Sequence, residues 1–337
     1  MTSPKQIIQP RRAKRPLRRR RNAHGATTPS YRTTEKNQYR YDQLKPKRLP
    51  ARTTVRQLIS GWEIGRPIGE GQTTVVCEAF SAHAPDAQQA VYTIKFLKEE
   101  FQRNRFAQEA LIQEGRLGQV LNNPHVVSVL AAGLEQAPYY LVMPYLRGET
   151  LRDYLLERHK VDVPVALSVI RQITRAILAL GDAGYVHLNL KPGKILISPE
   201  GCVTLLDLAN VRLFDRLHPL PLRDFQGTYA YAAPERFSDR QPLTPSSDVY
   251  SLGILFYELL VGKVPFLARS VDDFIHCHRE APLPPFGSNV PPAVVKLIQR
   301  MTSKLPIRRP LASEVLNEVI ALEIEYHKGL FLDNKSA

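Results

Sequence analysis

Apolar and polar residues alternate in short runs between residues 62 and 142. Alternation with a period of two, rich in β-branched and aromatic residues, is typical of strands that are buried on one face. We predict five strands of an antiparallel sheet, at residues 62–68, 73–80, 91–96, 126–131 and 139–142. Between the third and the fourth strand, residues 102–121 lack proline and repeat apolar side chains at helical spacing, which predicts one helix.

The pattern becomes helical after Gly148. Segments with apolar residues at helical spacing alternate with connectors that contain Pro and Gly. They predict helices at residues 151–158, 164–180, 250–261, 291–301 and 312–327. The predicted fold class is therefore α+β, with a small, mainly β lobe, a larger, mainly α lobe, and a cleft between them.

Positive charge is concentrated in the first 60 residues, which hold 17 Lys or Arg against only Glu35 and Asp42. The other 277 residues hold 29 basic and 30 acidic side chains, so the excess belongs to this segment alone. Few of its residues are aliphatic, and burial cannot offset the entropy of ordering, which predicts a disordered basic tail. The tail is either a solvated extension or a contact for a polyanion such as RNA, DNA, an acidic protein or anionic lipid.

The rest of the composition argues against a secreted or membrane protein. The three cysteines are far apart and lack CxxC spacing, so neither a disulfide framework nor a zinc site is predicted. The longest apolar run, Ile254 to Val261, is interrupted by Glu258 and falls well short of the ~20 residues that span a bilayer. Pro10 and Pro16 interrupt the amphipathic helix that a transit peptide needs, and no apolar signal segment is present. We therefore expect a cytoplasmic protein.

Two features in the predicted sheet suit phosphate binding, although each has a simpler interpretation. Gly69 and Gly71 lie between two strands, where backbone N–H groups can approach phosphate oxygens closely, but taken alone they are better explained by a hairpin turn. Lys95 ends the third strand, where a surface lysine is the simpler interpretation. The features that follow in order are an acidic helix, a loop around His187, Asp207 after an apolar strand, and Ala233-Pro234-Glu235.

This order of motifs is the protein-kinase signature. The sequence resembles the protein-kinase family, most closely its bacterial Ser/Thr branch, from residue 61 to about residue 320. The resemblance implies ATP and Mg²⁺ as cofactors and a hinge at residues 144–147 between the lobes. The residues that it implies for nucleotide binding are Gly69, Gly71, Val76, Lys95, Glu114, Met143, Pro144, Leu146 and Leu196.

Individual roles follow from the same resemblance. Met143 matches the gatekeeper, and Leu146 would donate its N–H to adenine, because Pro144 can offer only its C=O. Lys95 is expected to pair with a helix glutamate, for which Glu114 and Glu109 compete. Glu114 is preferred, because it lies ten residues before the proline of the Asn-Pro-His motif that follows the helix.

The catalytic-loop stretch YVHLNLKPGKIL, residues 185–196, departs from the family pattern HRDLKPENIL where the chemistry takes place. Lys191 is retained. Asn189 replaces the Asp that accepts the substrate proton, and a neutral amide cannot take that proton near pH 7. Lys194 replaces the Asn that binds the second Mg²⁺, and a protonated lysine cannot be a metal ligand. Asp207 keeps the other carboxylate that would bind Mg²⁺.

At the remaining motif positions, the residues for regulation by phosphorylation are missing, whereas the residues that hold the fold together are retained. Leu188 replaces the Arg that clamps a phosphorylated activation loop, and residues 208–227 contain no Ser, Thr or Tyr, so activation by phosphorylation is not expected. Asp248 matches the residue that binds the catalytic-loop backbone, and Glu235 is expected to pair with Arg309. These matches predict a complete kinase fold.

The predicted organisation is a basic tail at residues 1–60, a kinase-like domain at 61–325 and a C-terminal tail at 326–337. Within the domain, the N-lobe covers residues 61–143 and the C-lobe covers residues 148–325.

Three functional hypotheses follow. The first is a pseudokinase that serves as a regulatory scaffold for a protein partner or client, with nucleotide binding that is weak or absent. The second is an active, atypical Ser/Thr kinase, because Lys95, Glu114, Lys191 and Asp207 can still position ATP. In the third, residues 1–60 contact nucleic acid or another polyanion, and the kinase-like domain is only a folding unit.

Overall fold

The computed structural model describes residues 58–82, 91–214, 228–238 and 241–333, all within one compact unit of residues 48–337. The predicted basic tail up to residue 57 lies outside the described residues, so its disorder stays a prediction. The predicted boundary at residue 60 is too late, because Leu58–Ile59 forms strand β1. Ile59 is buried there and packs against Trp62, which explains why the sheet begins earlier than the alternation of the sequence indicates.

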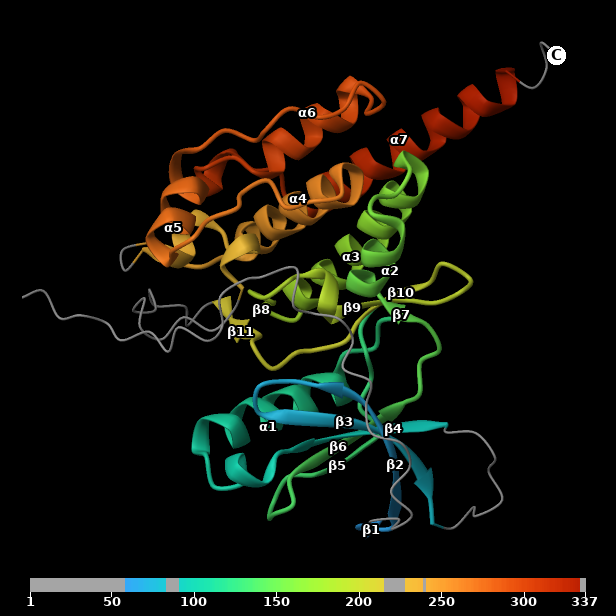
Figure 1. The fold of residues 1–337 in the computed structure, drawn as a ribbon, viewed down its shortest axis with the longest axis vertical. Coiled ribbons are helices and arrows are strands. Elements are labelled where there is room, and N and C mark those ends of the chain that lie inside the picture. Colours follow the sequence, from blue (N-terminus) through green and yellow to red (C-terminus); the bar gives the residue numbers. More distant parts are fainter. Residues whose placement is uncertain (1–57, 83–90, 215–227, 239–240, 334–337) are drawn as a thin grey trace, which may run out of the picture. The chain divides into compact units, whose positions relative to one another are not determined.

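A six-stranded antiparallel sheet forms the small lobe, in the order β1-β2-β3-β4-β6-β5 (Figure 1). After β1, its strands are β2 (Trp62–Glu70), β3 (Thr74–Ser81), β4 (Tyr92–Leu97), β5 (Ala131–Gly133) and β6 (Tyr140–Pro144). Four of the five predicted strands lie within about two residues of these bounds. The α+β prediction is confirmed.

The fourth strand is displaced from its predicted position at residues 126–131. Val126 forms an isolated parallel bridge with Leu205, and Val127 N–H donates to Leu205 O at 2.9 Å. The apolar run therefore connects the small lobe to the large one, and only its end enters the sheet as β5. Periodicity records that these side chains are buried but not which backbone they pair with.

Helix α1 (Arg105–Val120) packs on the sheet through a face built partly from glycine. Its N-cap Asn104 accepts a hydrogen bond from Ala107 N at 3.0 Å. At Gly118 a Cβ atom would come within 2.5 Å of Val129 Cγ2, so only glycine permits this close approach. Phe106 and Val120, which fit the apolar period of the sequence, are 78% and 80% exposed.

The large lobe is mainly helical (Figure 1). Its helices are α2 (Leu151–Arg158), α3 (Val163–Asp182), α4 (Pro245–Val261), α5 (Val271–Glu280), α6 (Pro292–Met301) and α7 (Ala312–Asp333). All but α5 match predicted helices. Helix α7 continues through residues 326–333, where a C-terminal tail is predicted, so the predicted boundary at residue 325 falls inside a helix.

Helix α3 is the one described helix that is long and apolar enough to cross a membrane. Polar residues interrupt its sequence, so it does not stand out as an unbroken apolar run. In this fold 61% of its most apolar stretch is buried. It packs against α4 and α7, and its residues Leu167, Ile170 and Ile173 belong to the core of the large lobe. Its apolar character is thus explained by packing within the protein.

Short strands and turns at the base of the large lobe carry the candidate site. The strands are β7 (Glu149–Thr150), β8 (Tyr185–Val186), β9 (Ile195–Ile197), β10 (Val203–Leu205) and β11 (Arg212–Leu213). The 3₁₀ turns in the described part of the chain are η2 (Glu99–Phe101), η3 (Pro192–Lys194), η6 (Tyr229–Tyr231), η7 (Pro234–Phe237) and η8 (Pro306–Arg308). Because β9 pairs with β10 and β8 pairs with β11, residues 187–194 and 206–211 are held next to each other.

Candidate functional site

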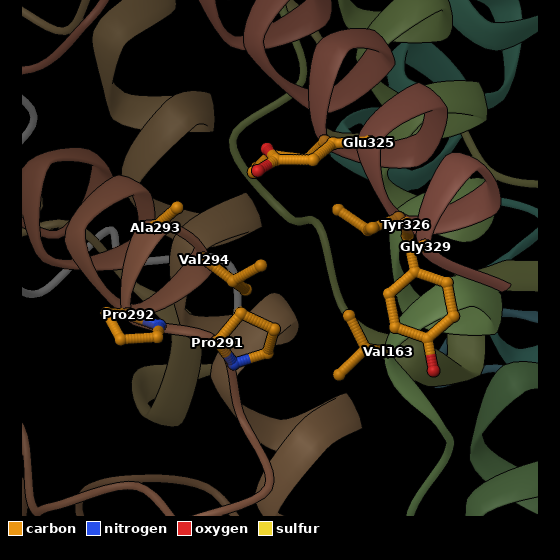
Figure 2. A pocket seen from close by; sticks show the side chains of 10 residues that line it. Val163, Pro291, Pro292, Ala293, Val294, Glu325, Tyr326 and Gly329 are labelled. Carbon is orange, nitrogen blue, oxygen red and sulfur yellow. The ribbon is translucent and has the colours of Figure 1, made fainter. Parts of the chain in front are cut away.

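Among the cavities in the described part of the chain, two have similar volumes. One, of about 590 Å³, lies between α3, α6 and α7, and Figure 2 shows Val163, Pro291, Val294 and Tyr326 around it. Among the described residues that line it, Glu325 is the only charged one, and no pair of groups suits acid–base or phosphate chemistry. The chemistry lies in the second cavity.

The second cavity, of about 580 Å³, gathers residues from both lobes. Of the predicted site, it is lined by Gly71, Lys95, Glu114, Asn189, Lys191, Lys194 and Asp207. The turn between β2 and β3, the N-terminal half of α1 and the catalytic loop complete its wall. Residues that are more than 100 positions apart in the chain thus meet in one place.

Lys95 on β4 and Glu114 on α1 form a buried ion pair, with 2.6 Å between Nζ and Oε2. Glu109 pairs instead with Arg105 on the exposed face of α1, so the preferred assignment of Glu114 is the one that the geometry shows. Burial lowers the pKa of Lys95, but the carboxylates of Asp207 and Glu114 outweigh burial and hold this pKa above its ordinary value. Lys95 is therefore a permanent cation.

Asp207 follows β10 and has both carboxylate oxygens engaged. Oδ1 accepts from Lys95 Nζ at 3.2 Å and from Ala209 N at 3.0 Å, while Oδ2 accepts from Lys194 Nζ. Burial alone would raise the pKa of Asp207, but Lys95 and Lys194 hold it well below its usual range. The carboxylate is thus charged and lies between two ammonium groups.

Asp248 at the start of α4 fixes the backbone of the catalytic loop. Its two carboxylate oxygens accept from His187 N at 2.6 Å and from Leu188 N at 2.8 Å. Leu188 has a φ of 62°, in the left-handed region, which costs a branched residue about 1–2 kcal/mol. The two buried hydrogen bonds offset this strain and hold the loop in one conformation.

His187 connects the loop to the segment that carries Asp207. Its Nε2 donates to Asp207 O at 2.8 Å, and its Nδ1 accepts from Asn189 N at 3.2 Å. Burial, with the charge of Lys194, lowers the pKa of His187 to about 4. The ring is therefore neutral at pH 7 and acts as a structural link rather than a proton acceptor.

Asn189 occupies the position of the missing catalytic carboxylate. Its Nδ2 donates to Asn210 Oδ1 at 2.9 Å, and the side chain is almost buried. Lys191 Nζ donates to Thr228 Oγ1 at 2.8 Å, and burial together with the charge of Lys194 lowers the pKa of Lys191 to about 8. This arrangement can hold anions and hydrogen-bonding groups, but Asn189 cannot accept a proton.

Sequence reasoning did not identify Asn210 and Thr228 as parts of the site. Asn210 accepts a hydrogen bond from Asn189, and Thr228 accepts one from Lys191, each across more than 20 positions of sequence. Asn and Thr are common in loops, so neither residue stands out in the sequence. Asn210 lies three residues after Asp207, which was the available signal, whereas Thr228 is brought to Lys191 only by the fold.

The other predicted nucleotide residues do not line the cavity. They are Gly69, Val76, Met143, Pro144, Leu146 and Leu196. Gly69 pairs with Val76 across β2 and β3, and Met143 pairs with Thr93 across β4 and β6. The cavity thus contains the phosphate end of the predicted site, and the predicted adenine contacts stay a prediction.

The residues do not fit Mg²⁺. Hard divalent cations need several oxygen ligands. The retained carboxylate, Asp207, already accepts three hydrogen bonds, two of them from ammonium groups. The second ligand position holds Lys194, which repels a cation.

A fully buried ion pair behind the site preserves the architecture. Arg309 NH1 and NH2 donate to Glu235 Oε1 and Oε2 at 2.6 and 2.8 Å, as expected from the sequence. Arg309 also donates to Ser246 O and Ser303 O, and Ser247 Oγ donates to Glu235, so both charges are well satisfied.

Comparisons with known proteins agree with this fold. The family model described as "Protein kinase domain" matches residues 62–320. Serine/threonine-protein kinase PknA of Mycobacterium tuberculosis is 34% identical over 221 residues, which are 64% of this chain and 51% of that protein. PknL of the same species is 35% identical over 199 residues, 58% of this chain and 50% of that protein.

A third relative, "Probable serine/threonine-protein kinase CPE1738" of Clostridium perfringens, is 28% identical over 284 residues, 82% of this chain and 40% of that protein. The chain thus spans about half the length of these relatives or less. The order of motifs, the bilobal α+β fold and the matched range agree, and the chain belongs to the protein kinase family.

Proposed function

We propose that this protein is a pseudokinase, a kinase fold that acts by binding and regulation with little or no phosphoryl transfer. The observation that carries the proposal is the Lys194–Asp207 ion pair, which occupies the carboxylate that a metal would need. Asn189 in the position of the catalytic base supports it independently. The homologues named above are Ser/Thr kinases. Two departures from the family pattern distinguish this chain: Asn189 stands at the position of the catalytic Asp, and Lys194 at the position of the metal-binding Asn.

The two departures act on different parts of the reaction. Loss of a general base alone slows a reaction by about 10²- to 10⁴-fold. Loss of the metal removes the charge that stabilises the transferring phosphoryl group, and positioning with electrostatic stabilisation accounts for most of the catalysis of this reaction. Together they leave a site that can bind phosphate groups but not activate an acceptor hydroxyl.

The alternative is an active, atypical Ser/Thr kinase, and one observation favours it. The Lys95–Glu114 ion pair is formed, and it is the pair that positions nucleotide phosphates in active kinases. A chain that had lost every function of the cleft would not need this buried pair, since a buried ion pair is seldom more stable than apolar residues of the same size.

Repair of the site distinguishes the two functions. We expect no phosphotransfer from ATP and Mg²⁺ to a generic protein substrate by the wild type, and measurable transfer by the Asn189→Asp, Lys194→Asn double variant. The same double variant with Lys95→Ala should be inactive again, which controls for a contaminating kinase. Wild-type transfer that Lys95→Ala abolishes would establish the active kinase instead.

The basic tail, the partner and the location belong to the same proposal. A tail with 17 basic residues would recruit a polyanion to a cytoplasmic scaffold, whose protein client binds elsewhere. Polyanion binding should then weaken steeply with salt, and removal of residues 1–57 should abolish it while the kinase-like domain stays folded. Retention of binding in the truncated chain would place the polyanion site in the domain.

A further inference from the structure

Among the described residues, the charged side chains that line the second cavity are three lysines and two carboxylates. They are Lys95, Lys191 and Lys194 on one side and Glu114 and Asp207 on the other. The described cavity therefore carries an excess of one positive charge before any ligand enters. A metal-dependent phosphoryl-transfer site has the opposite character, because its carboxylates need a cation before phosphate groups can approach.

The ammonium groups retain capacity for a ligand. An ammonium has three N–H donors. The described hydrogen bonds of Lys194 and Lys191 use one each, to Asp207 and to Thr228. Lys194 Nζ is held beside Asp207, which is where a metal-dependent site would place its divalent cation.

We propose that this cavity binds the polyphosphate chain of a nucleoside triphosphate directly, without a divalent cation, and that Lys194 supplies the charge that Mg²⁺ would otherwise provide. The inference rests on the proposed function, because it concerns the same cleft. Lys194 is tethered by Asp207 and needs little reorganisation to meet a phosphate oxygen, and charge-assisted hydrogen bonds to phosphate are among the stronger ones.

Charge also determines how Mg²⁺ should act. Free ATP carries more negative charge than its Mg²⁺ complex, so a cavity with excess positive charge favours the free form. Mg²⁺ bound to the nucleotide would approach the ammonium groups of Lys194 and Lys95, and both carboxylate oxygens of Asp207 already accept hydrogen bonds. Added Mg²⁺ should therefore compete with the protein for the phosphates and weaken binding.

The test is a titration of a fluorescent ATP analogue into the full chain, followed by anisotropy, in EDTA and in excess Mg²⁺. We expect the wild type to bind in EDTA, with equal or weaker affinity in Mg²⁺, and unlabelled tripolyphosphate to compete. Lys194→Asn should weaken binding in EDTA by about ten- to a hundredfold, the loss expected for one charge-assisted hydrogen bond. It should also make Mg²⁺ strengthen binding.

The exposed Lys263→Asn variant removes the same charge outside the cavity and should leave the affinity in both buffers unchanged. Thermal unfolding verifies that each variant is folded. If Lys194→Asn does not fold, the affinity of the wild type for the ATP analogue in EDTA, compared with that in Mg²⁺, still shows whether binding needs a divalent cation.

Failure of the inference is distinguishable from failure of the proposed function. Wild-type binding that requires Mg²⁺, or no binding in either buffer, overturns metal-free binding but leaves the pseudokinase proposal intact if phosphotransfer is absent. Competition by tripolyphosphate as strong as that of ATP would keep the inference and assign the affinity to the phosphates alone. Phosphotransfer by a wild type that binds without metal would overturn the proposed function and keep the inference.

Discussion

Phosphate binding in the cavity should weaken as the pH rises through about 8, because Lys191 loses its proton there. Burial and the neighbouring charge of Lys194 lower the pKa of Lys191 to about 8, while Asp207 opposes this shift and Arg152 adds to it. A bound phosphate needs the charged form, so binding above this pH requires uptake of a proton. The direction is therefore loss of affinity with increasing pH.

The magnitude follows from the same value. At pH 7 about nine tenths of the free protein carries the proton on Lys191, and at pH 9 about one tenth does, so the Kd should rise about tenfold between them. Tenfold corresponds to about 1.4 kcal/mol of binding free energy. Phosphate monoesters ionise near pH 6, below this range, and their ionisation would change affinity in the opposite direction.

The assay is the nucleotide titration in EDTA, repeated between pH 7 and pH 9 on three proteins. Lys191→Arg keeps a permanent cation, so its Kd should stay flat across this range. Lys191→Met should bind weakly at every pH. The pKa of Lys304 is also about 8, but Lys304 lies against Cys277 and Phe266, away from the cavity, and is present in all three proteins. A wild-type Kd that does not change, or an equal loss of affinity in Lys191→Arg, would refute this reasoning.

Three further predictions concern the fold. Arg309→Ala should lower the free energy of unfolding by about 3–5 kcal/mol, measured by urea denaturation, because it leaves the buried Glu235 carboxylate without its partner; a loss below about 1 kcal/mol would contradict this. Gly118→Ala should destabilise by about 1–3 kcal/mol through overpacking. The matched helical change Gly181→Ala, where a Cβ meets nothing within 4 Å, should stabilise by up to about 1 kcal/mol, and equal effects of the two would be inconsistent with the packing of α1. Burial, with the charge of Lys304, lowers the pKa of His278 to about 3, so the stability that this group contributes is present above the unfolded pKa near 6.5 and is lost as the pH falls. His278 alone should account for about 2 kcal/mol of the change in unfolding free energy between pH 7 and pH 5, so the loss over this interval should be about 2 kcal/mol smaller in His278→Gln than in the wild type.

Sequence patterns predicted five of the six described helices of the large lobe and missed α5. Helix α2 has the predicted bounds, and α3 lies within two residues of them. Helix α5 escaped because only Phe274 and His278 are buried along its ten residues, so no apolar period is present to read. Its capping residue Ser270 and the acidic first turn were the remaining signals.

The buried face of α1 shows another limit of periodicity. Its buried face combines Leu111 and Leu117 with small residues such as Gly115 and Gly118, while the large Phe106 side chain is exposed. A hydrophobicity pattern weights large side chains, whereas close packing of a helix on a sheet selects small ones. Part of this contact was therefore not visible in the pattern of large apolar residues.

The candidate site was predictable as far as motifs specify positions. The Lys95–Glu114 pair and the contacts of Asp248 were expected from the resemblance to the kinase family and are present. The Lys194–Asp207 pair was not expected, because it depends on the pairing of β9 with β10 and on the Leu206 N to Lys194 O hydrogen bond of 2.9 Å. The sequence indicates that Lys194 cannot bind a metal. The fold adds that Lys194 forms an ion pair with Asp207, the carboxylate that could bind one.

The measurement that tests the central claim most directly is phosphotransfer by the purified wild-type chain with ATP and excess Mg²⁺, followed by mass spectrometry of the chain and of a protein substrate. If Lys194 takes the place of the metal and Asn189 stands where the catalytic base is needed, the wild type should transfer no more phosphate than the Lys95→Ala variant. Transfer by the wild type that is absent from Lys95→Ala would contradict the claim.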